Sequence, residues 1–105
     1  RTLFVVPDNE LRKRYNDKYF DDMDIGLARS IISYSTLENK IDQNILTASP
    51  ITLFNTKNDY NKLCITNISG QTIINNTIKI IHFNHLVGNG IIHVINDLLI
   101  PSSQI

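Results

Sequence analysis

One stretch near the C-terminus, residues 89–101 (NGIIHVINDLLIP), restricts the possible folds of this chain more than any other segment. It opens on an Asn-Gly turn signal, continues as an uncharged and mostly β-branched run, and closes at the breaker Pro101. A short run of this kind between turn residues and a proline predicts a strand. Because apolar residues occupy both alternating positions, we expect neither face of the strand to contact water. His93 is a polar ring in the middle of this run.

A second strand is predicted at the N-terminus. Residues 2–6 are β-branched, apolar or aromatic, and Pro7 ends the run. Asp8 is placed to cap a following helix, and Leu11 and Tyr15, four positions apart, would lie on one side of that helix. The chain is therefore expected to begin with a strand that leads directly into a short helix.

The middle of the chain combines helix patterns with a series of short strands. Apolar residues at helical spacing predict an amphipathic helix from Ile25 to about Ser35, residues 41–47 form a shorter candidate, and residues 19–24 read as an acidic loop or helix start. Short strands separated by turn residues indicate antiparallel sheets, and together with the helices they give the α+β class. The predicted strands are residues 51–54, 63–66, 71–74, 78–83 and 91–95.

Size and charge narrow the possible functions. The chain has 105 residues, which is enough for one domain but not for two. Its 10 Lys and Arg residues balance 10 Asp and Glu residues, so no global field draws it to nucleic acid. No apolar run reaches the length of a membrane span, so we expect no direct membrane insertion. The single cysteine, Cys64, is either a small buried residue in a strand or a bridge to another chain.

The C-terminal stretch resembles the second signature box of the fasciclin-like domain family, which reads close to N-G-V-I-H-V-I-D-x-V-L-L-P. One position departs from the box, because the family has Asp where this chain has Asn96, with Asp97 one residue later. The matching residues are Asn89, Gly90, Ile92, His93, Val94, Ile95, Leu99 and Pro101.

The N-terminal stretch TLFVVPDNEL resembles the first box of the same family, T-x-F-A-P-T-[ND]-x-A-F, in a form with bulkier residues. The two boxes have the order and the approximate separation that the family shows. The resemblance implies a single fasciclin-like α+β domain over residues 1–105, with antiparallel β-sheets forming a wedge or sandwich and a small helical layer. The residues that match the first box are Phe4, Pro7, Asn9 and Leu11.

Family domains begin with helices that lie before the first box, whereas this chain starts at that box. We therefore expect a domain truncated at its N-terminus, whose missing layer comes from an absent N-terminal segment or from another chain. An uncovered apolar sheet face would leave the chain marginally stable or prone to self-association.

The resemblance also implies a function, a non-enzymatic module for cell adhesion or protein interaction in a secreted or cell-surface protein. Its partner would be a surface receptor, a matrix protein or an assembly subunit, bound through exposed helix and loop surfaces. A Tyr-His pair of the family is often linked to integrin-type adhesion; Tyr34 matches its Tyr, and Ser35 replaces its His. The candidate protein-binding residues are Tyr34, Ser35, Asp22 and Asp24. The alternative is a structural subunit that packs against another chain in a viral particle or a secretory organelle.

The three histidines are more easily read as structural residues than as metal ligands. His82 and His85 are three apart, and such residues on a strand point to opposite faces, so we expect no metal site. His93 is expected to be a buried, neutral side chain that bonds to a backbone carbonyl or to Asp8 or Asn9 of the first box.

Other motifs offer little chemistry. Asn67 and Asn75 each begin an N-glycosylation sequon, which matters if the protein passes through a secretory pathway. The acidic residues between 21 and 24 lack the glycine and the alternating oxygen ligands of a calcium loop. No nucleophile elbow, phosphate-binding loop or dinucleotide-binding glycine motif occurs, so the sequence predicts neither an enzyme nor a cofactor.

Overall fold

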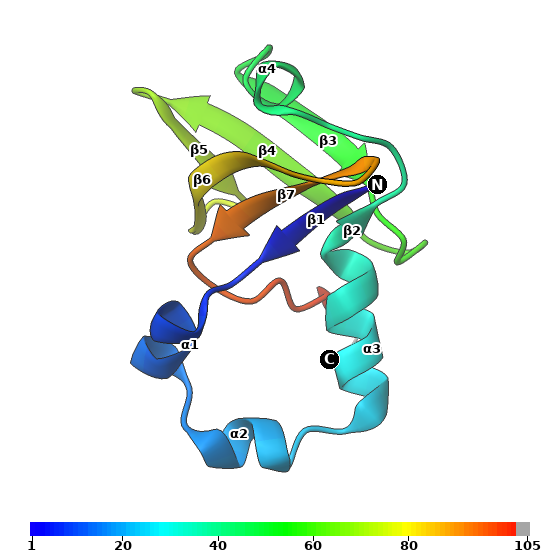
Figure 1. Cartoon of the computed structure of the whole chain (residues 1–105), viewed down its shortest axis with the longest axis vertical. Coiled ribbons are helices and arrows are strands. Elements are labelled where there is room, and N and C mark those ends of the chain that lie inside the picture. Colours follow the sequence, from blue (N-terminus) through cyan, green and yellow to red (C-terminus); the bar gives the residue numbers. More distant parts are fainter. Residues whose placement is uncertain (103–105) are drawn as a thin grey trace.

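The computed structural model describes residues 1–102 and has the predicted α+β architecture (Figure 1). A curved sheet forms one half of the molecule, and the helices α1, α2 and α3 form an arc beside it. The elements are β1 (Thr2–Val5), α1 (Asp8–Arg14), α2 (Asp17–Asp21), α3 (Ile25–Tyr34), β2 (Thr36–Leu37), α4 (Gln43–Leu46), β3 (Ile51–Asn55), β4 (Lys62–Ile68), β5 (Gln71–Ile74), β6 (Ile78–Val87) and β7 (Gly90–Ile95).

The strands form one seven-stranded sheet with the order β2-β1-β7-β6-β5-β4-β3. β1 and β7 run parallel, whereas the other neighbouring pairs are antiparallel, so the sheet is mixed and not purely antiparallel as predicted. Two parallel strands need a long connection between them, and the connection from β1 to β7 is almost the whole chain. The short turns on which the prediction relied join only antiparallel strands. Beyond β3, the backbone N–H of Lys57 donates to the Thr36 carbonyl at 2.8 Å, so the two ends of the curved sheet approach each other.

Strand β7, the predicted organising strand, is less uniformly buried than its sequence suggested. Ile91, His93 and Ile95 are buried, but Ile92 and Val94 on the other face are half-buried. The expectation that neither face contacts water is therefore wrong for one face. An apolar residue at a half-buried position has the same letter code as one in the core, so the sequence pattern alone does not separate the two.

The start of α1 differs from the sequence prediction. Pro7, with an extended backbone, occupies the N-cap position, and its carbonyl accepts hydrogen bonds from the N–H groups of Glu10 and Leu11. Asp8 is therefore the first helical residue and not the cap. Its carboxylate accepts a hydrogen bond from Arg12 Nε at 2.6 Å, four positions along the helix.

The acidic segment before α3 contains a short helix, α2, and then the cap of α3. Asn16 caps α2, because its side chain accepts a hydrogen bond from the Tyr19 N–H at 3.0 Å. Asp24 caps α3 by accepting hydrogen bonds from the N–H groups of Gly26 and Leu27 at 2.9 and 3.3 Å. The helix predicted from Ile25 is confirmed to within one residue at its C-terminal end.

Strand β6 is longer than predicted, because it continues past Phe83 to Val87 and forms a hairpin with β7. The pairing has register shifts between Ile80 and His85, and Asn84 there has a left-handed backbone with φ of 63°. Such irregularities bend a strand and interrupt its alternation. The polar residues of this segment hid its strand character in the sequence.

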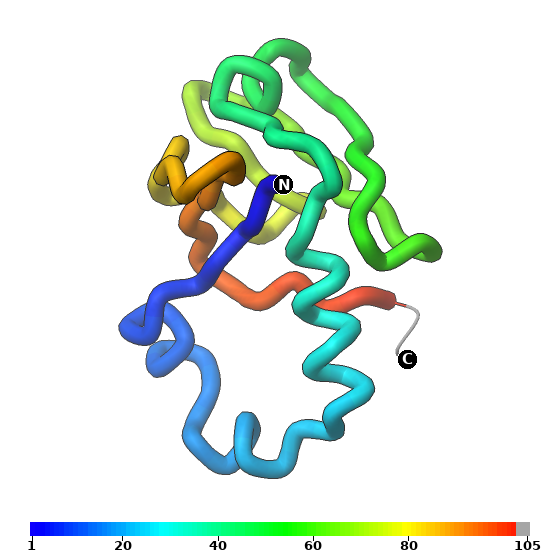
Figure 2. Tube along the Cα trace, turned by 45° about the vertical axis from the view of Figure 1, so that its right-hand side comes forward, coloured from blue at the N-terminus to red at the C-terminus, as the bar shows by residue number. Residues whose placement is uncertain are grey.

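The hydrophobic core lies inside the curved sheet, and α4 closes one end of it. Leu46 of α4 is fully buried against the cluster of core side chains from the sheet. The chain after β7 then runs from the α1 side across to α3, as both views show (Figure 2). The fully buried apolar side chains of the sheet are Leu63, Ile65, Ile74 and Ile95.

Leu46 and its neighbour Ile45 give a matched test of this packing. Leu46 is 0% exposed and Ile45 is 46% exposed on the same helix. Leu46→Ala should lower the free energy of unfolding by about 2–5 kcal/mol, because it leaves a cavity in the core. Ile45→Ala should change it by less than about 1 kcal/mol. Urea denaturation measures both, and equal losses would show that α4 does not close the core.

Candidate functional site

The two signature boxes lie side by side in the structure, and the side chain of His93 joins them to a third segment. In the parallel pairing of β1 with β7, Phe4 is the register partner of His93. His93 is fully buried, and its Nε2 lies 2.7 Å from the Ile41 carbonyl oxygen. Its Nδ1 accepts a hydrogen bond from the backbone N–H of Asn84 at 3.1 Å. Because Nδ1 is an acceptor, Nε2 carries the proton and donates to Ile41, so the ring is neutral.

This geometry confirms the predicted backbone carbonyl partner of His93, whereas the alternative partners Asp8 and Asn9 are wrong. Both lie on the exposed surface of α1. The ring of His93 instead packs between two aromatic rings, with its centroid 5.7 Å from that of Phe4 and 5.5 Å from that of Phe83. Burial lowers the pKa of His93 below its ordinary value of 6.5, although the Ile41 carbonyl and the carboxylate of Asp42 oppose the shift.

The loop that receives His93 is held by two further side chains that the sequence analysis missed. The hydroxyl of Thr2 donates to the Asn39 carbonyl at 2.7 Å and accepts from the Ile41 N–H at 2.7 Å. The Asn84 side chain accepts from the Gln43 N–H at 2.9 Å. Thr2 is fully buried, which the sequence does not show, so nothing in the sequence pointed to the first contact.

Gly90 of the second box lies where a side chain would have little space. A Cβ atom at Gly90 would lie 3.1 Å from the Arg1 carbonyl oxygen, so a side chain there would crowd the start of β1. Pro101 is buried at the end of the box, and Asn89 is an exposed residue of the turn before β7. In the first box, Phe4 is in the core and Pro7 begins α1.

Asp97, the residue shifted by one position from the family pattern, connects the second box to the end of α1. Its Oδ1 accepts hydrogen bonds from the Tyr15 hydroxyl at 2.8 Å and from the Leu98 N–H at 2.7 Å. Arg14 Nε lies 3.9 Å from the other carboxylate oxygen. Burial and the contact with Asp97 raise the pKa of Tyr15 well above its ordinary range. Asn96 in turn bonds to Lys79 of β6 through both its backbone and its side chain.

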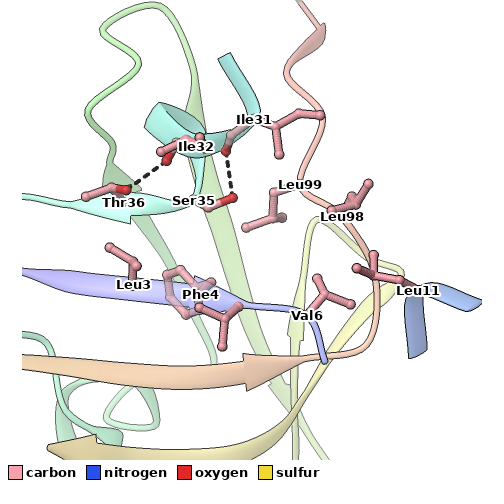
Figure 3. Close-up of a pocket in the computed structure, with 11 residues that line it drawn as sticks. Leu3, Phe4, Val6, Leu11, Ile31, Ile32, Ser35, Thr36, Leu98 and Leu99 are labelled. Carbon is pink, nitrogen blue, oxygen red and sulfur yellow. Dashed lines mark hydrogen bonds between the residues drawn. The ribbon is translucent and has the colours of Figure 1, made fainter. Parts of the chain in front are cut away.

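An apolar groove lies beside the first box, where β1, α1, α3 and the chain after β7 meet (Figure 3). We call it the first-box groove, and its volume is about 250 Å³. The hydroxyl groups of Ser35 and Thr36 at its edge already donate to the carbonyls of Ile31 and Ile32, each at 2.7 Å, which leaves the groove apolar. The side chains that line it are Leu3, Phe4, Val5, Val6, Leu11, Ile31, Ile32, Leu98 and Leu99.

A comparison with known protein families identifies the family that the two boxes indicate. The family model described as the Fasciclin domain matches residues 1–101. The chain belongs to the fasciclin family. A search among curated proteins finds no match. Fasciclin domains generally act in cell adhesion or protein interaction, and they occur in secreted and cell-surface proteins. Within residues 1–102, no helix has the length and the apolar character needed to cross a membrane.

The four residues predicted to bind a partner fall into a buried group and a surface group. Tyr34 and Ser35 are buried, and both use their polar groups inside the domain. The Tyr34 hydroxyl donates to the Lys62 carbonyl and accepts from the Asn75 side chain, each at 2.9 Å, so it ties α3 to the sheet. The expectation that Tyr34 and Ser35 lie on an exposed surface is therefore wrong. A tyrosine on the apolar stripe of an amphipathic helix was the signal for this role.

The acidic residues of the prediction remain at the surface. Asp22 is exposed and pairs with Lys18 at 2.7 Å, and Asp24 caps α3. Beside them, the rings of Tyr15, Tyr19 and Phe20 pack together with centroid distances between 4.6 and 5.7 Å. No group of three or more His, Cys, Asp or Glu side chains within residues 1–102 is arranged to hold a metal ion.

Both sequon asparagines already use their side-chain amides in the fold. Asn67 Nδ2 donates to the carbonyls of Leu46 and Ser49 at 2.9 and 2.8 Å. Asn75, at the β5–β6 turn with φ of 52°, donates to Tyr34 and accepts from the Cys64 N–H at 3.0 Å. A glycosylated Nδ2 keeps one N–H, so a glycan on Asn67 would break one of its two bonds, and a glycan on Asn75 would have to fit beside the bond to Tyr34. The use of the sequons stays a prediction.

Cys64 lies on the outer face of the sheet and is half-buried, in contrast to its interpretation as a buried strand residue. Its register partner on β3 is Leu53, which is exposed. This thiol is free within the chain. A bridge from Cys64 to another chain stays a prediction.

The junction at His93 predicts a pH-dependent stability. Below pH 6.5, the unfolded chain binds a proton that the folded chain excludes, so the free energy of unfolding should fall as the pH decreases. The full stability is present above pH 6.5, and the loss ends below the lowered pKa of the folded state. Denaturant unfolding between pH 8 and pH 5 measures this slope.

Two variants test whether His93 causes this dependence of the free energy of unfolding on pH. The double variant His82→Gln/His85→Gln, which changes exposed side chains, should retain it. His93→Leu should abolish the contribution and also cost about 1–3 kcal/mol at pH 8 for each partner left unpaired, the Ile41 carbonyl and the Asn84 N–H. A His93→Leu protein as stable as the parent would contradict the role of the junction.

Proposed function

We propose that this fasciclin domain is a non-enzymatic module that binds a protein partner in cell adhesion, and that it acts in a secreted or cell-surface protein. The partner inserts an apolar segment into the first-box groove. The observation that carries this proposal is the apolar lining of that groove on a face bordered by exposed helix residues. Interfaces of this kind place an apolar anchor in a pocket and surround it with polar contacts.

The rim of the groove indicates the chemistry of the partner. A neighbouring hollow shares Ile32 and Thr36 with the groove, and Arg1, Arg29 and Lys57 border it. Lys57 is paired with Glu38 at 2.7 Å, whereas Arg29 is exposed and makes no ion pair within residues 1–102. Charge complementarity therefore favours an amphipathic segment, with apolar side chains for the groove and a carboxylate for Arg29.

The second candidate function is a structural subunit that packs on another chain in a viral particle or a secretory organelle. The same groove supports it, because a permanent partner would cover Leu3 and Ile32, which are exposed here. The two candidates differ in the identity of the partner. Adhesion predicts a membrane or matrix protein, whereas assembly predicts subunits of the same particle.

Two surface substitutions test the groove. Ile32 is 66% exposed, so Ile32→Asp should leave the fold intact and place a charge at the mouth of the groove. Ile32→Asp and Arg29→Glu should each weaken binding by about ten-fold or more, since they remove an apolar anchor and reverse the rim charge. The measurement is adhesion of cells to a surface coated with the protein, combined with cross-linking mass spectrometry of native material without reductant.

Ile45→Asp is the matched control, because Ile45 is an exposed isoleucine on α4, away from the groove. It should bind as the parent does. Cross-links from the groove only to particle subunits would support the assembly function. Equal adhesion of all three variants and the parent would exclude the groove as the docking site.

A further inference from the structure

One end strand of the sheet borders a groove on its outer edge and not another strand of the described chain. β2 and β3 are the two end strands of the sheet. β2 has two residues, Thr36 and Leu37, and both are buried. β3 has five residues, and the nearest facing segment, residues 37–41, is separated from it by a groove of about 450 Å³. β3 is therefore the edge at which another strand can add.

The hydrogen-bond pattern tells which backbone groups of β3 face outward. The Asn67 N–H donates to the Pro50 carbonyl at 2.9 Å, one position before β3. In an antiparallel pair, hydrogen-bonded positions alternate with positions that do not bond to the partner. Residues 52 and 54 therefore bond to β4, and the N–H and C=O groups of Ile51, Leu53 and Asn55 point away from it.

The side chains of this edge lack the features that normally prevent edge pairing. Ile51 is 63% exposed and Leu53 is 62% exposed. The strand ITLFN carries no charge, and its ladder with β4 has no bulge. Soluble proteins usually protect such an edge with lysine, proline within the strand or a bulge. An uncharged edge with exposed apolar residues is suited to a partner strand of the same character.

We propose that β3 pairs with β3 of a second copy of this chain, antiparallel and centred on Leu53. The strand is complementary to itself in this register. Leu53 lies opposite Leu53 of the second copy, and Ile51 lies opposite Asn55. The outward backbone groups of all three residues then find partners across a two-fold axis. The paired residues, Ile51–Asn55, carry no charge, so no like charges meet.

The pairing also covers apolar surface on the outer face of the sheet. Leu53 is the register partner of Cys64, and Ile51 is the register partner of Thr66. Thr66 in turn pairs with Ile73 of β5, which extends this surface toward the sheet centre. When two copies pair, the apolar outer-face surfaces of the two chains lie next to each other, and the two sheets form one continuous sheet. This surface is separate from the first-box groove, so it does not depend on the proposed function.

The register gives a decisive cross-linking experiment in the full chain, with Cys64→Ser as background. Opposite residues in a hydrogen-bonded antiparallel pair have Cα atoms about 5.5 Å apart, within the range of about 4.4–6.8 Å for a disulfide. Leu53→Cys should therefore form a covalent dimer under mild oxidation. Ile51→Cys should not, because the two copies of residue 51 are more than about 13 Å apart along the strands. Equal cross-linking of both variants would overturn the register.

Association without cross-linking is measured by analytical ultracentrifugation over a range of concentrations. Leu53→Lys places two like charges opposite each other and should weaken the dimer by about ten-fold or more. Ile25→Lys is the control, because Ile25 is 67% exposed at the start of α3 and should leave the dimer unchanged. A parent chain that stays monomeric at millimolar concentration would overturn the proposal. Loss of self-association in Ile32→Asp, with Leu53→Lys unchanged, would move the dimer contact to the first-box groove.

Discussion

The structure depends on the parallel pairing of β1 with β7, because this pairing makes strands from opposite ends of the sequence neighbours within one sheet. Both strands are short, and a pair of short strands is marginal by itself. The buried ring of His93 adds contacts that reach beyond the pair, to Ile41 before α4 and to Asn84 of β6. Asp97 adds a second connection, to Tyr15 after α1. The signature boxes of this fasciclin domain thus hold the fold together, and side chains of both boxes also line the first-box groove.

Polar residues in this chain do not indicate where a partner binds, because several of them use their polar groups inside the fold. Tyr34, Asn67 and Asn75 carry groups that sequence analysis associates with adhesion or glycosylation, but each uses those groups to fix one element on another. An unpaired polar group inside a protein is costly, so a buried tyrosine or asparagine acquires partners before it is available for recognition. The accessible features are apolar and inconspicuous in the sequence, namely the first-box groove and the β3 edge.

Much of the fold could be predicted from the sequence, because local patterns determine it. The spacing of Leu27, Ile31 and Tyr34 gave α3, and the β-branched runs gave most strands. Features that depend on distant segments could not be read in this way. The two residues of β2 have no pattern of their own, and the left-handed Asn84 becomes meaningful only opposite His93. The partners of His93 and the open side of β3 follow from the strand order, which local periodicity does not contain.

The parallel pair also has a consequence for the order of folding. Among the strands of residues 1–102, β1 is synthesised first and its neighbour β7 last. Closing so long a loop is slow, because the chain loses much conformational freedom before the contact forms. β3, β4, β5 and β6 are joined by local hairpins and can assemble while β1 pairs only with β2. β1 therefore gains its parallel neighbour late, and in the nascent chain the side of β1 that pairs with β7 stays open until β7 has been synthesised.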